Sequence, residues 1–205
     1  MERGLMVVVS GPAGSGKGTV NAELLKTGEF VYSVSATTRA PRPGEVDGVN
    51  YHFIAEEEFR HRLEEGGMLE YTQYCGNFYG TPRREAEEVL ESGKHLILEI
   101  EVDGAMQVKK RYPEAILIML LPPSYEVQEQ RLRGRATETE EKFLARLEQT
   151  KFEVRRLPEY DYVVYNRDGG ALACAEEIKN IVRAERHATK RSPDAASDYF
   201  RKQSQ

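Results

Sequence analysis

Residues 5–19 read LMVVVSGPAGSGKGT, an apolar run followed by a glycine-rich loop and the start of a helical pattern. Gly11, Gly16 and Lys17 have the GxxxxGK[ST] spacing of a nucleotide phosphate loop. Glycines allow positive φ, so successive N–H groups can turn toward phosphate oxygens, and the following helix adds its free N–H groups. A glycine-rich turn that binds nothing is the alternative, and the strand and helix on either side disfavour it. The stretch therefore predicts a strand, a phosphate-binding loop and a helix.

One position departs from this motif. Residue 18 is Gly where Ser or Thr would normally hold Mg²⁺. The hydroxyl of Thr19 could take that place, or the ion could keep more of its waters. Lys17 supplies the mobile positive charge that the β- and γ-phosphates require.

Short apolar runs elsewhere predict the rest of a sheet. Buried strands are expected at Leu5–Val9, His95–Ile100, Ile116–Leu121 and Tyr162–Tyr165. Helical patterns follow them at Lys17–Lys26, Val102–Arg111, Ser124 (as cap) to Arg133, and Ala171–Arg186. This alternation predicts an α/β fold in which helices cover both faces of a parallel sheet. Ligands in such sheets gather at the carboxyl ends of the strands, here just after Val9, Glu101, Leu121 and Tyr165.

Composition narrows the class of protein. The 205 residues carry 29 basic and 34 acidic side chains, a formal net charge of −5, so a nonspecific nucleic-acid binder is not expected. Any anionic ligand must then be held by local clusters of Lys and Arg. The longest apolar stretch, Ala115–Leu121, is far shorter than a membrane span. Met1–Gly4 runs directly into the first strand without a signal-peptide pattern. Cys75 and Cys174 have no metal-ligand spacing, so we expect reduced thiols in a cytoplasmic protein.

The segment Tyr32–Tyr79 breaks the alternation and predicts a small β-rich insert with one helix, Glu56–Glu65. Within it, Arg39 and Arg42 flank Pro41, which stiffens the turn between them. Two forked guanidinium groups at that separation can grip one phosphate. The alternative is a solvated loop in which these arginines pair with the nearby acids, Glu45 and Asp47.

Residues 70–81, EYTQYCGNFYGT, place a carboxylate and several hydroxyl groups around a turn at Gly76-Asn77. A carboxylate such as Glu70 can accept hydrogen bonds from N1–H and the exocyclic amine of guanine. Adenine has no edge that presents two such donors side by side. The alternative is a hairpin of two aromatic strands. The motif alone does not decide between them.

A second segment, Arg131–Leu157, is a charged helical region interrupted at Gly134. Thr137 followed by Glu140 fits a capping box that restarts the helix. The tail His187–Gln205 has few large apolar residues, so we expect it to be frayed.

Five motifs in this order resemble those of the guanylate kinases, enzymes that move a phosphoryl group from ATP to GMP. They are Ser10–Thr19 (SGPAGSGKGT), Ser35–Glu45 (SATTRAPRPGE), Gly76–Thr81 (GNFYGT), Leu98–Glu101 (LEIE) and Arg131–Glu138 (RLRGRATE). The resemblance covers about residues 4–185 and implies a P-loop NTPase-type three-layer fold. It implies a core at 4–32, 82–130 and 158–186, a GMP-binding insert at 33–81, a helical lid at 131–157 and a flexible tail at 187–205. It also implies ATP and GMP as substrates and Mg²⁺ as cofactor, and it specifies no oligomeric state.

The resemblance further implies a role for each matching residue. The catalytic residues would be Lys17, Arg39, Arg131, Arg135 and Arg146. ATP would contact Gly11, Pro12, Ala13, Gly14, Ser15, Gly16, Lys17, Gly18, Thr19, Arg135 and Asn166. GMP would contact Ser35, Arg39, Arg42, Tyr51, Glu70, Tyr79, Thr81 and Glu101. The metal contacts, partly through water, would be Thr19 and Glu99.

Some of these positions carry alternatives. Thr81 and Glu101 stand where many relatives carry Ser and Asp. Glu99 could be a strand-end acid that contacts only solvent, and the arginines of residues 131–146 could form helical ion pairs with Glu138, Glu141 and their neighbours.

Other functions also fit the motifs. A related kinase could phosphorylate AMP or a phosphorylated ribose, although the guanine-reading set Ser35, Glu70 and Thr81 favours GMP. A guanylate-kinase-like scaffold module would bind phosphopeptides, but the complete Gly16-Lys17 loop disfavours it. A nucleotide-binding regulator with little turnover is the third alternative.

Overall fold

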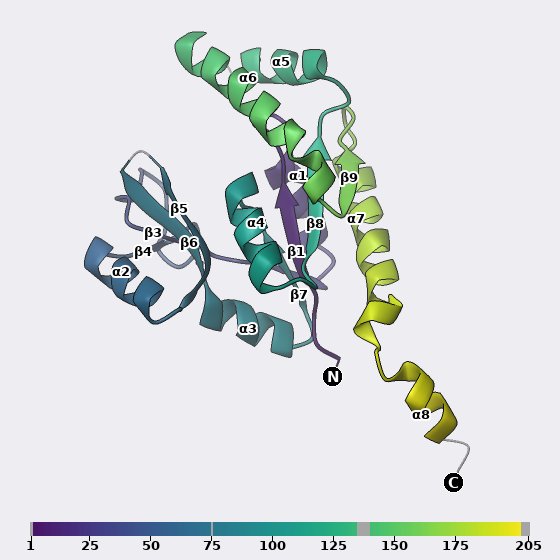
Figure 1. Cartoon of the computed structure of the whole chain (residues 1–205). Coiled ribbons are helices and arrows are strands. Elements are labelled where there is room, and N and C mark those ends of the chain that lie inside the picture. The colour runs from purple at the N-terminus through teal and green to yellow at the C-terminus, as the bar shows by residue number, and fades with distance from the viewer. Residues whose placement is uncertain (1, 75, 135–139, 202–205) are drawn as a thin grey trace.

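The computed structural model describes residues 2–74, 76–134 and 140–201, and its centre is a five-stranded parallel sheet. The strands lie in the order β2-β7-β1-β8-β9 (Figure 1). Their bounds are β1 Met6–Ser10, β2 Phe30–Tyr32, β7 His95–Leu98, β8 Ile116–Leu121 and β9 Tyr162–Tyr165. The predicted parallel sheet is confirmed, with one edge strand that the sequence pattern did not indicate. That strand, β2, has only three residues and pairs with β7 alone.

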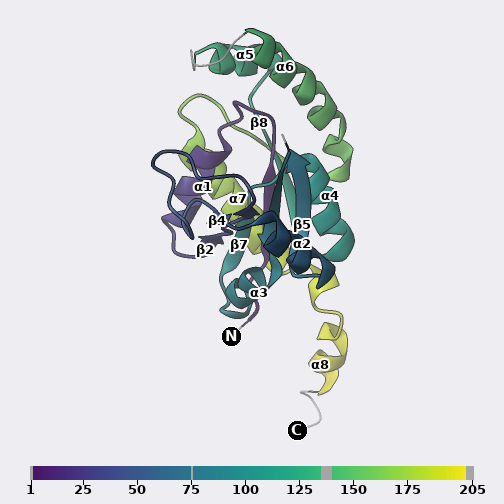
Figure 2. The same cartoon turned by 90° about the vertical axis from the view of Figure 1, so that its left-hand side faces the viewer.

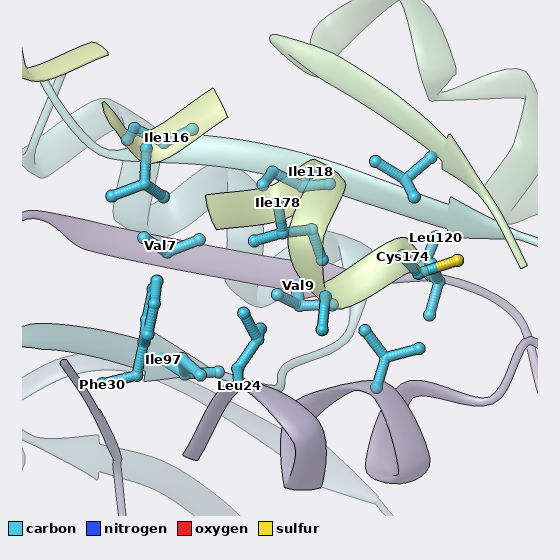
Figure 3. Close-up of a cluster of buried hydrophobic side chains, with 14 residues drawn as sticks. Val7, Val9, Leu24, Phe30, Ile97, Ile116, Ile118, Leu120, Cys174 and Ile178 are labelled. Atoms are coloured by element: carbon cyan, nitrogen blue, oxygen red, sulfur yellow. The ribbon is translucent and has the colours of Figure 1, made fainter. Parts of the chain in front are cut away.

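Helices cover both faces of this sheet, which gives the three layers. One face carries α1 (Lys17–Leu25) and α7 (Ala171–Arg186), and the other carries α3 (Arg83–Glu91) and α4 (Val102–Arg111) (Figure 2). All five residues of β1 are buried because both faces are covered. Val7 and Val9 pack in the cluster under α1 and α7 (Figure 3), while Met6 and Val8 pack in the opposite cluster. This alternation is the period-two pattern of a strand.

A second, four-stranded sheet forms the framework of the predicted insert. Its order is β4-β3-β6-β5, with β3 Ala36–Thr37, β4 His52–Phe53, β5 Met68–Tyr74 and β6 Asn77–Pro82. The helix α2 (Glu56–Glu64) packs Phe59 onto this sheet, against Ala36, Met68 and Phe78. The antiparallel pair β5–β6 is the hairpin of two aromatic strands that "Sequence analysis" gave as the alternative interpretation of residues 70–81.

The helix α4 joins the two sheets. The Gln107 side-chain amide exchanges two hydrogen bonds with the backbone of Tyr71 on the edge strand β5, at 3.2 and 2.9 Å. Arg111 donates to the carbonyl oxygens of Met68 and Leu69 on the same strand, at 2.7 and 3.2 Å. These side chains satisfy edge groups that would otherwise be unpaired.

Two further helices, α5 (Tyr125–Arg133) and α6 (Glu140–Arg155), lie beyond the carboxyl ends of the main strands (Figure 1). The Ser124 hydroxyl accepts from Val127 N–H at 3.3 Å, so the predicted cap of α5 is present. Gly134 ends this helix, as expected from the sequence. The predicted capping box at Thr137 falls outside the described residues.

After α6, the short 3₁₀ helix Leu157–Glu159 leads into β9. The described part of the chain ends in a 3₁₀ turn, Thr189–Arg191, and a short helix, α8 (Ala195–Arg201), without buried residues. Among the helices described, none is long and apolar enough to cross a membrane. Cys174 is a free, buried thiol, and Cys75 falls outside the described residues.

Candidate active site

The phosphate loop joins β1 to α1 at the carboxyl edge of the main sheet. The Lys17 ammonium donates to the carbonyl oxygens of Gly11 and Pro12, at 2.5 and 3.5 Å. The backbone turns through a Ser15 N–H bond to the Pro12 carbonyl at 3.1 Å. Gly16 caps α1 in the left-handed region, with φ 89°. The loop therefore has the tight turn and the free helix N-terminus that bind phosphate.

Asn166, at the end of β9, lies against this loop. Its side-chain amide donates to the Ser15 carbonyl at 2.8 Å, and the residue is only 7% exposed. A Cβ on Gly16 would lie 2.3 Å from that amide nitrogen, so only glycine allows this close approach. The geometry makes Asn166 a support of the loop. Its predicted contact with adenine stays a prediction.

Glu99, just after β7, is held by two neighbours rather than left to solvent. Asn21 donates to its Oε2 at 2.8 Å, and the Tyr32 hydroxyl donates to the same oxygen at 3.3 Å. Burial and the Glu99 carboxylate both raise the pKa of Tyr32, which keeps that hydroxyl a donor. This arrangement disfavours the alternative of a merely solvated strand-end acid.

The other predicted metal contact, Thr19, is exposed on the first turn of α1. A Cβ placed on the neighbouring Gly18 would meet no atom within 4 Å. The space that a motif Ser or Thr would use is therefore open to water. Among the described residues, no group of three or more His, Cys, Asp or Glu side chains could hold a metal ion by itself.

The insert gathers a cation and two phenols. The Arg39 guanidinium pairs with both carboxylate oxygens of Glu45, each at 3.0 Å, and its side chain is 15% exposed. It lies 5.5 Å from the ring centroid of Tyr51, whose ring is 6.0 Å from that of Tyr79. Hydrogen bonding with Glu45, and then with Tyr79, raises the pKa of Arg39. Three of the predicted phosphate contacts therefore lie together.

Glu45 also accepts from the backbone N–H of Arg42 at 2.7 Å, so one carboxylate orders the turn that carries both arginines. The Arg39–Glu45 pair is the ion pair that the sequence offered as an alternative to phosphate binding. Arg42 itself is exposed, and Ser35 lies just before β3. The two readings are compatible, because an ordered guanidinium still offers donors to a phosphate.

Glu70 and Thr81 face each other across the β5–β6 hairpin. The Thr81 hydroxyl donates to Glu70 Oε1 at 2.7 Å, and the two residues are 4% and 0% exposed. Burial raises the pKa of the Glu70 carboxyl, while the hydrogen bonds from Thr81 oppose that rise. The other oxygen, Oε2, lies so close to α4 that a Cβ on Gly104 would be 2.8 Å away. Glu101 caps the same helix and is exposed.

Arg131 reaches from α5 toward the phosphate loop. Its guanidinium donates to the Gly14 carbonyl at 3.4 Å, the Asn166 carbonyl at 2.8 Å and the Asp168 carboxylate at 2.8 Å. Among the described residues, its ion pair is with Asp168 rather than with an acid of its own helical region, and Glu138 falls outside those residues. Arg146 is exposed on α6, and Arg135 falls outside the described residues.

Sequence reasoning missed a buried acid in this region. Glu153, on α6, is 4% exposed, and its Oε2 has no hydrogen-bond partner in the described part of the chain. Burial, and then the charge of Glu101, raise its pKa to about 7, although the Lys17 ammonium lowers it. A run of charged helical residues gave no signal that this one faces inward. Asn21 was also missed. Its place between Val20 and Leu24 on the buried side of α1 was the one signal that it faces inward.

Comparison with known proteins identifies the family. Residues 3–185 match the sequence profile described as guanylate kinase. The chain belongs to the guanylate kinase family. A guanylate kinase from Streptococcus agalactiae is 50% identical over 192 residues, which are 93% of this chain and 91% of that protein. One from Desulfitobacterium hafniense is 47% identical over 191 residues, 93% and 94% of the two chains.

A solved structure of a guanylate kinase, from Anaplasma phagocytophilum, agrees in fold. It superposes with a TM-score of 0.73 at 35% identity, covering 93% of this chain and 90% of that one. The part of this chain that matches the family profile, residues 3–185, includes the phosphate loop, the small sheet and the α5–α6 pair, and it ends near the end of α7. The sequence-based assignment to guanylate kinases is confirmed.

Proposed function

We propose that the protein is a guanylate kinase, which transfers the γ-phosphoryl group of ATP to GMP and releases ADP and GDP. One observation carries the proposal. A phosphate loop on the main sheet and a buried Glu70–Thr81 pair on the small sheet occur in one chain of this family. The first suits the phosphates of ATP, and the second suits the paired donors of guanine. Such an enzyme would act in GMP recycling in the cytoplasm.

The chemistry asks for alignment and charge neutralisation rather than covalent catalysis. The attacking oxygen of GMP is already anionic, so no strong general base is needed. Lys17 would leave the Gly11 carbonyl for the β- and γ-phosphates, since its ammonium lies at the loop. Arg39, with Tyr51 and Tyr79 beside it, would hold the GMP phosphate. Arg131, Arg135 and Arg146 would neutralise the transferring group.

The residues present fit Mg²⁺ bound mainly by nucleotide phosphates and water. Mg²⁺ keeps several waters and commonly uses one or two carboxylates together with substrate phosphates. Glu99, oriented by Asn21 and Tyr32, offers one such carboxylate, and the open space beside Gly18 leaves room for water. The ion would supply charge neutralisation on the β- and γ-phosphates. Glu99 and Thr19 would orient its waters.

Water must also be kept from the γ-phosphate, or ATP would be hydrolysed. The helices α5 and α6 lie beyond the phosphate loop, and the small sheet lies on another side of the main sheet (Figure 1). We propose that residues 131–157 act as a lid and residues 33–81 as the GMP-binding insert. Closure of both over two bound nucleotides would exclude water and complete the site.

The test is ADP and GDP formation by the purified full chain, with ATP and each nucleoside monophosphate in turn, with and without Mg²⁺. We expect turnover with GMP and Mg²⁺, and far less with AMP or a phosphorylated ribose. Faster turnover with another acceptor would make that compound, rather than GMP, the substrate. Absence of any product, with nucleotides still bound, would favour a regulator, and phosphopeptide binding without ATP binding would favour a scaffold module.

A further inference from the structure

A buried chain of hydrogen bonds joins the phosphate loop to α6. Gln128 on α5 and Thr150 on α6 are only 2% and 3% exposed. The Gln128 amide nitrogen donates to the Ala13 carbonyl at 2.9 Å and to the Thr150 hydroxyl at 2.6 Å. That hydroxyl donates in turn to the Arg146 carbonyl at 2.9 Å. These hydrogen bonds therefore connect the backbone of the phosphate loop to the backbone of Arg146.

Every donor hydrogen in this hydrogen-bond network has one acceptor. The Gln128 amide has two hydrogens and uses both, and the Thr150 hydroxyl has one hydrogen and uses it. A reversed amide would place its oxygen against the Ala13 carbonyl, acceptor against acceptor. The orientation of the amide is thus determined by its neighbours. A buried network in which every donor hydrogen is used fixes the relative position of the groups it joins.

The surroundings support the same contact. Leu132, Phe143 and Leu147 form an apolar cluster between α5 and α6 that also packs against Ala13. Arg131 lies three residues after Gln128 and reaches the next loop carbonyl, that of Gly14. Helix α5 therefore holds two successive carbonyls of the loop, and Gln128 also bonds a buried side chain of α6.

We propose that Gln128 and Thr150 are positioning residues that hold this part of the lid, α6 with the backbone of Arg146, in place at the phosphate loop while the site closes. This inference rests on the proposed kinase function, in which Arg146 acts on the transferring phosphoryl group. A guanidinium displaced by about 1 Å loses much of its effect on such a step. The apolar contacts between α5 and α6 act without a preferred geometry, and the ion pair of Arg133 with Glu140, at 3.5 Å, is exposed and therefore weak. Neither would prevent this shift.

The test compares near-isosteric variants. Gln128→Glu keeps the shape but cannot donate to Ala13, and Thr150→Val keeps the shape but lacks the hydroxyl. We expect each to lower kcat by about tenfold, with the KM for GMP within about twofold of wild type. Thr150→Ser should restore the wild-type kcat. The matched control is Gln130→Glu, at an exposed position of the same helix, which should change nothing.

A double variant and a second readout complete the design. If both residues act in one chain, Gln128→Glu with Thr150→Val should be little worse than either alone. Hydrogen exchange of the α6 amides near Thr150 should be faster in the single variants, while β1 and β8 stay protected. This readout needs no turnover, so it distinguishes failure of the inference from failure of the proposed function. If Gln128→Glu does not fold, Gln128→Met removes the donors without adding charge.

Three outcomes would overturn the inference. The first is a wild-type kcat in both single variants, and the second is a Thr150→Ser variant as impaired as Thr150→Val. The third is faster exchange throughout the main sheet, which would show that the two residues only stabilise the fold.

Discussion

Charge placement at single residues governs the proposed reaction. The Lys17 ammonium contacts loop carbonyls and contributes no ion pair in the described part of the chain. Glu70, in contrast, is buried and held by one hydroxyl. The first group is free to follow a phosphate, whereas the second is preorganised for a fixed partner. Their substitution should therefore affect different steps.

Replacing the Lys17 ammonium tests transition-state charge. Lys17→Ala should lower kcat by orders of magnitude, with little change in the free energy of unfolding, since it removes hydrogen bonds to two loop carbonyls but no ion pair of the described residues. Steady-state kinetics and urea denaturation measure the two effects. Lys26→Ala, at the exposed end of the same helix, is the control. A Lys17→Ala enzyme near wild-type speed would remove this residue from the mechanism.

The Glu70 carboxylate tests base recognition. Glu70→Gln should weaken GMP binding by about tenfold or more and leave ATP binding within about twofold, because only guanine offers the paired donors. Calorimetric titration with each nucleotide measures this split. Glu64→Gln, exposed on α2, should leave both affinities unchanged. Equal losses for the two nucleotides would count against the assignment.

At the scale of elements, α4 and α7 connect parts of the molecule that are distant in sequence. Helix α4 begins beside Glu101, packs Gly104 against Glu70 and bonds the edge of β5 through Gln107. Helix α7 carries Glu185 near its end, where the carboxylate accepts from Tyr162 at 2.7 Å and pairs with Lys190 and Arg191 at 3.0 and 2.9 Å. One helix therefore supports the proposed guanine site, and the other holds the start of the tail.

The close approach of α4 to Glu70 predicts a specificity effect without loss of stability. Gly104→Ala places a methyl group 2.8 Å from Glu70 Oε2, so the carboxylate must move. We expect the KM for GMP to rise about tenfold, with the KM for ATP within about twofold. The free energy of unfolding should not fall by more than about 1 kcal/mol, because alanine favours the helix. Lys110→Ala on the exposed side of α4 is the control, and an unchanged KM for GMP would contradict the prediction.

The Glu185 cluster predicts a pH-dependent contribution to stability. Its hydrogen bonds with Tyr162, Lys190 and Arg191 outweigh burial and lower the pKa of Glu185 from 4.5 to about 2. A lowered folded-state pKa stabilises the native state above pH 4.5, and the stabilisation is lost as pH falls toward 2. Glu185→Gln should therefore cost about 1–2 kcal/mol at pH 7 and progressively less in acid.

Urea denaturation at several pH values measures this difference. Glu176→Gln is the matched control, because its carboxylate on the same helix is 52% exposed in its pair with Lys179. It should cost less than about 0.5 kcal/mol. A Glu185→Gln penalty that stays constant from pH 7 to pH 3 would show that the carboxylate charge is not the cause.

For the whole molecule, stability depends on a histidine at the far end of the sheet from the site. His95 begins β7, accepts from the Leu5 N–H at 3.0 Å and is 4% exposed beside Phe30. Burial, and then the Arg186 charge, lower its pKa from 6.5 to about 4. Between these values the unfolded chain binds a proton that the folded protein does not.

The native state should therefore lose stability as pH falls from 6.5 toward 4, by on the order of 3 kcal/mol from this one group. His95→Asn keeps an acceptor for Leu5 and should flatten this part of the curve. Chemical denaturation from pH 7.5 to 4.5 gives the slope. His187→Asn, exposed after α7, should keep the wild-type slope. A His95→Asn slope equal to wild type would refute the assignment.

Local patterns in the sequence determined most of the architecture and one half of the site. The phosphate loop, four of the main strands and the helices after them follow from apolar period, glycine spacing and caps, which act between neighbours in the chain. The residues themselves offered Arg39 as a phosphate ligand and Glu70 as a guanine acceptor, each with an alternative, and the family resemblance favoured these roles. The Arg39–Tyr51–Tyr79 group and the Glu70–Thr81 pair then came together in the structure.

Tertiary contacts alone decided the remainder. The edge strand β2 is too short to show a period, and it exists because β7 pairs with it. The inward positions of Glu153, Gln128 and Asn166 depend on helices and loops far away in sequence. A polar residue gains a buried place only where a distant partner satisfies it or another element covers it. No local pattern encodes that partner, so packing, rather than the sequence around each residue, assigns these side chains to the site.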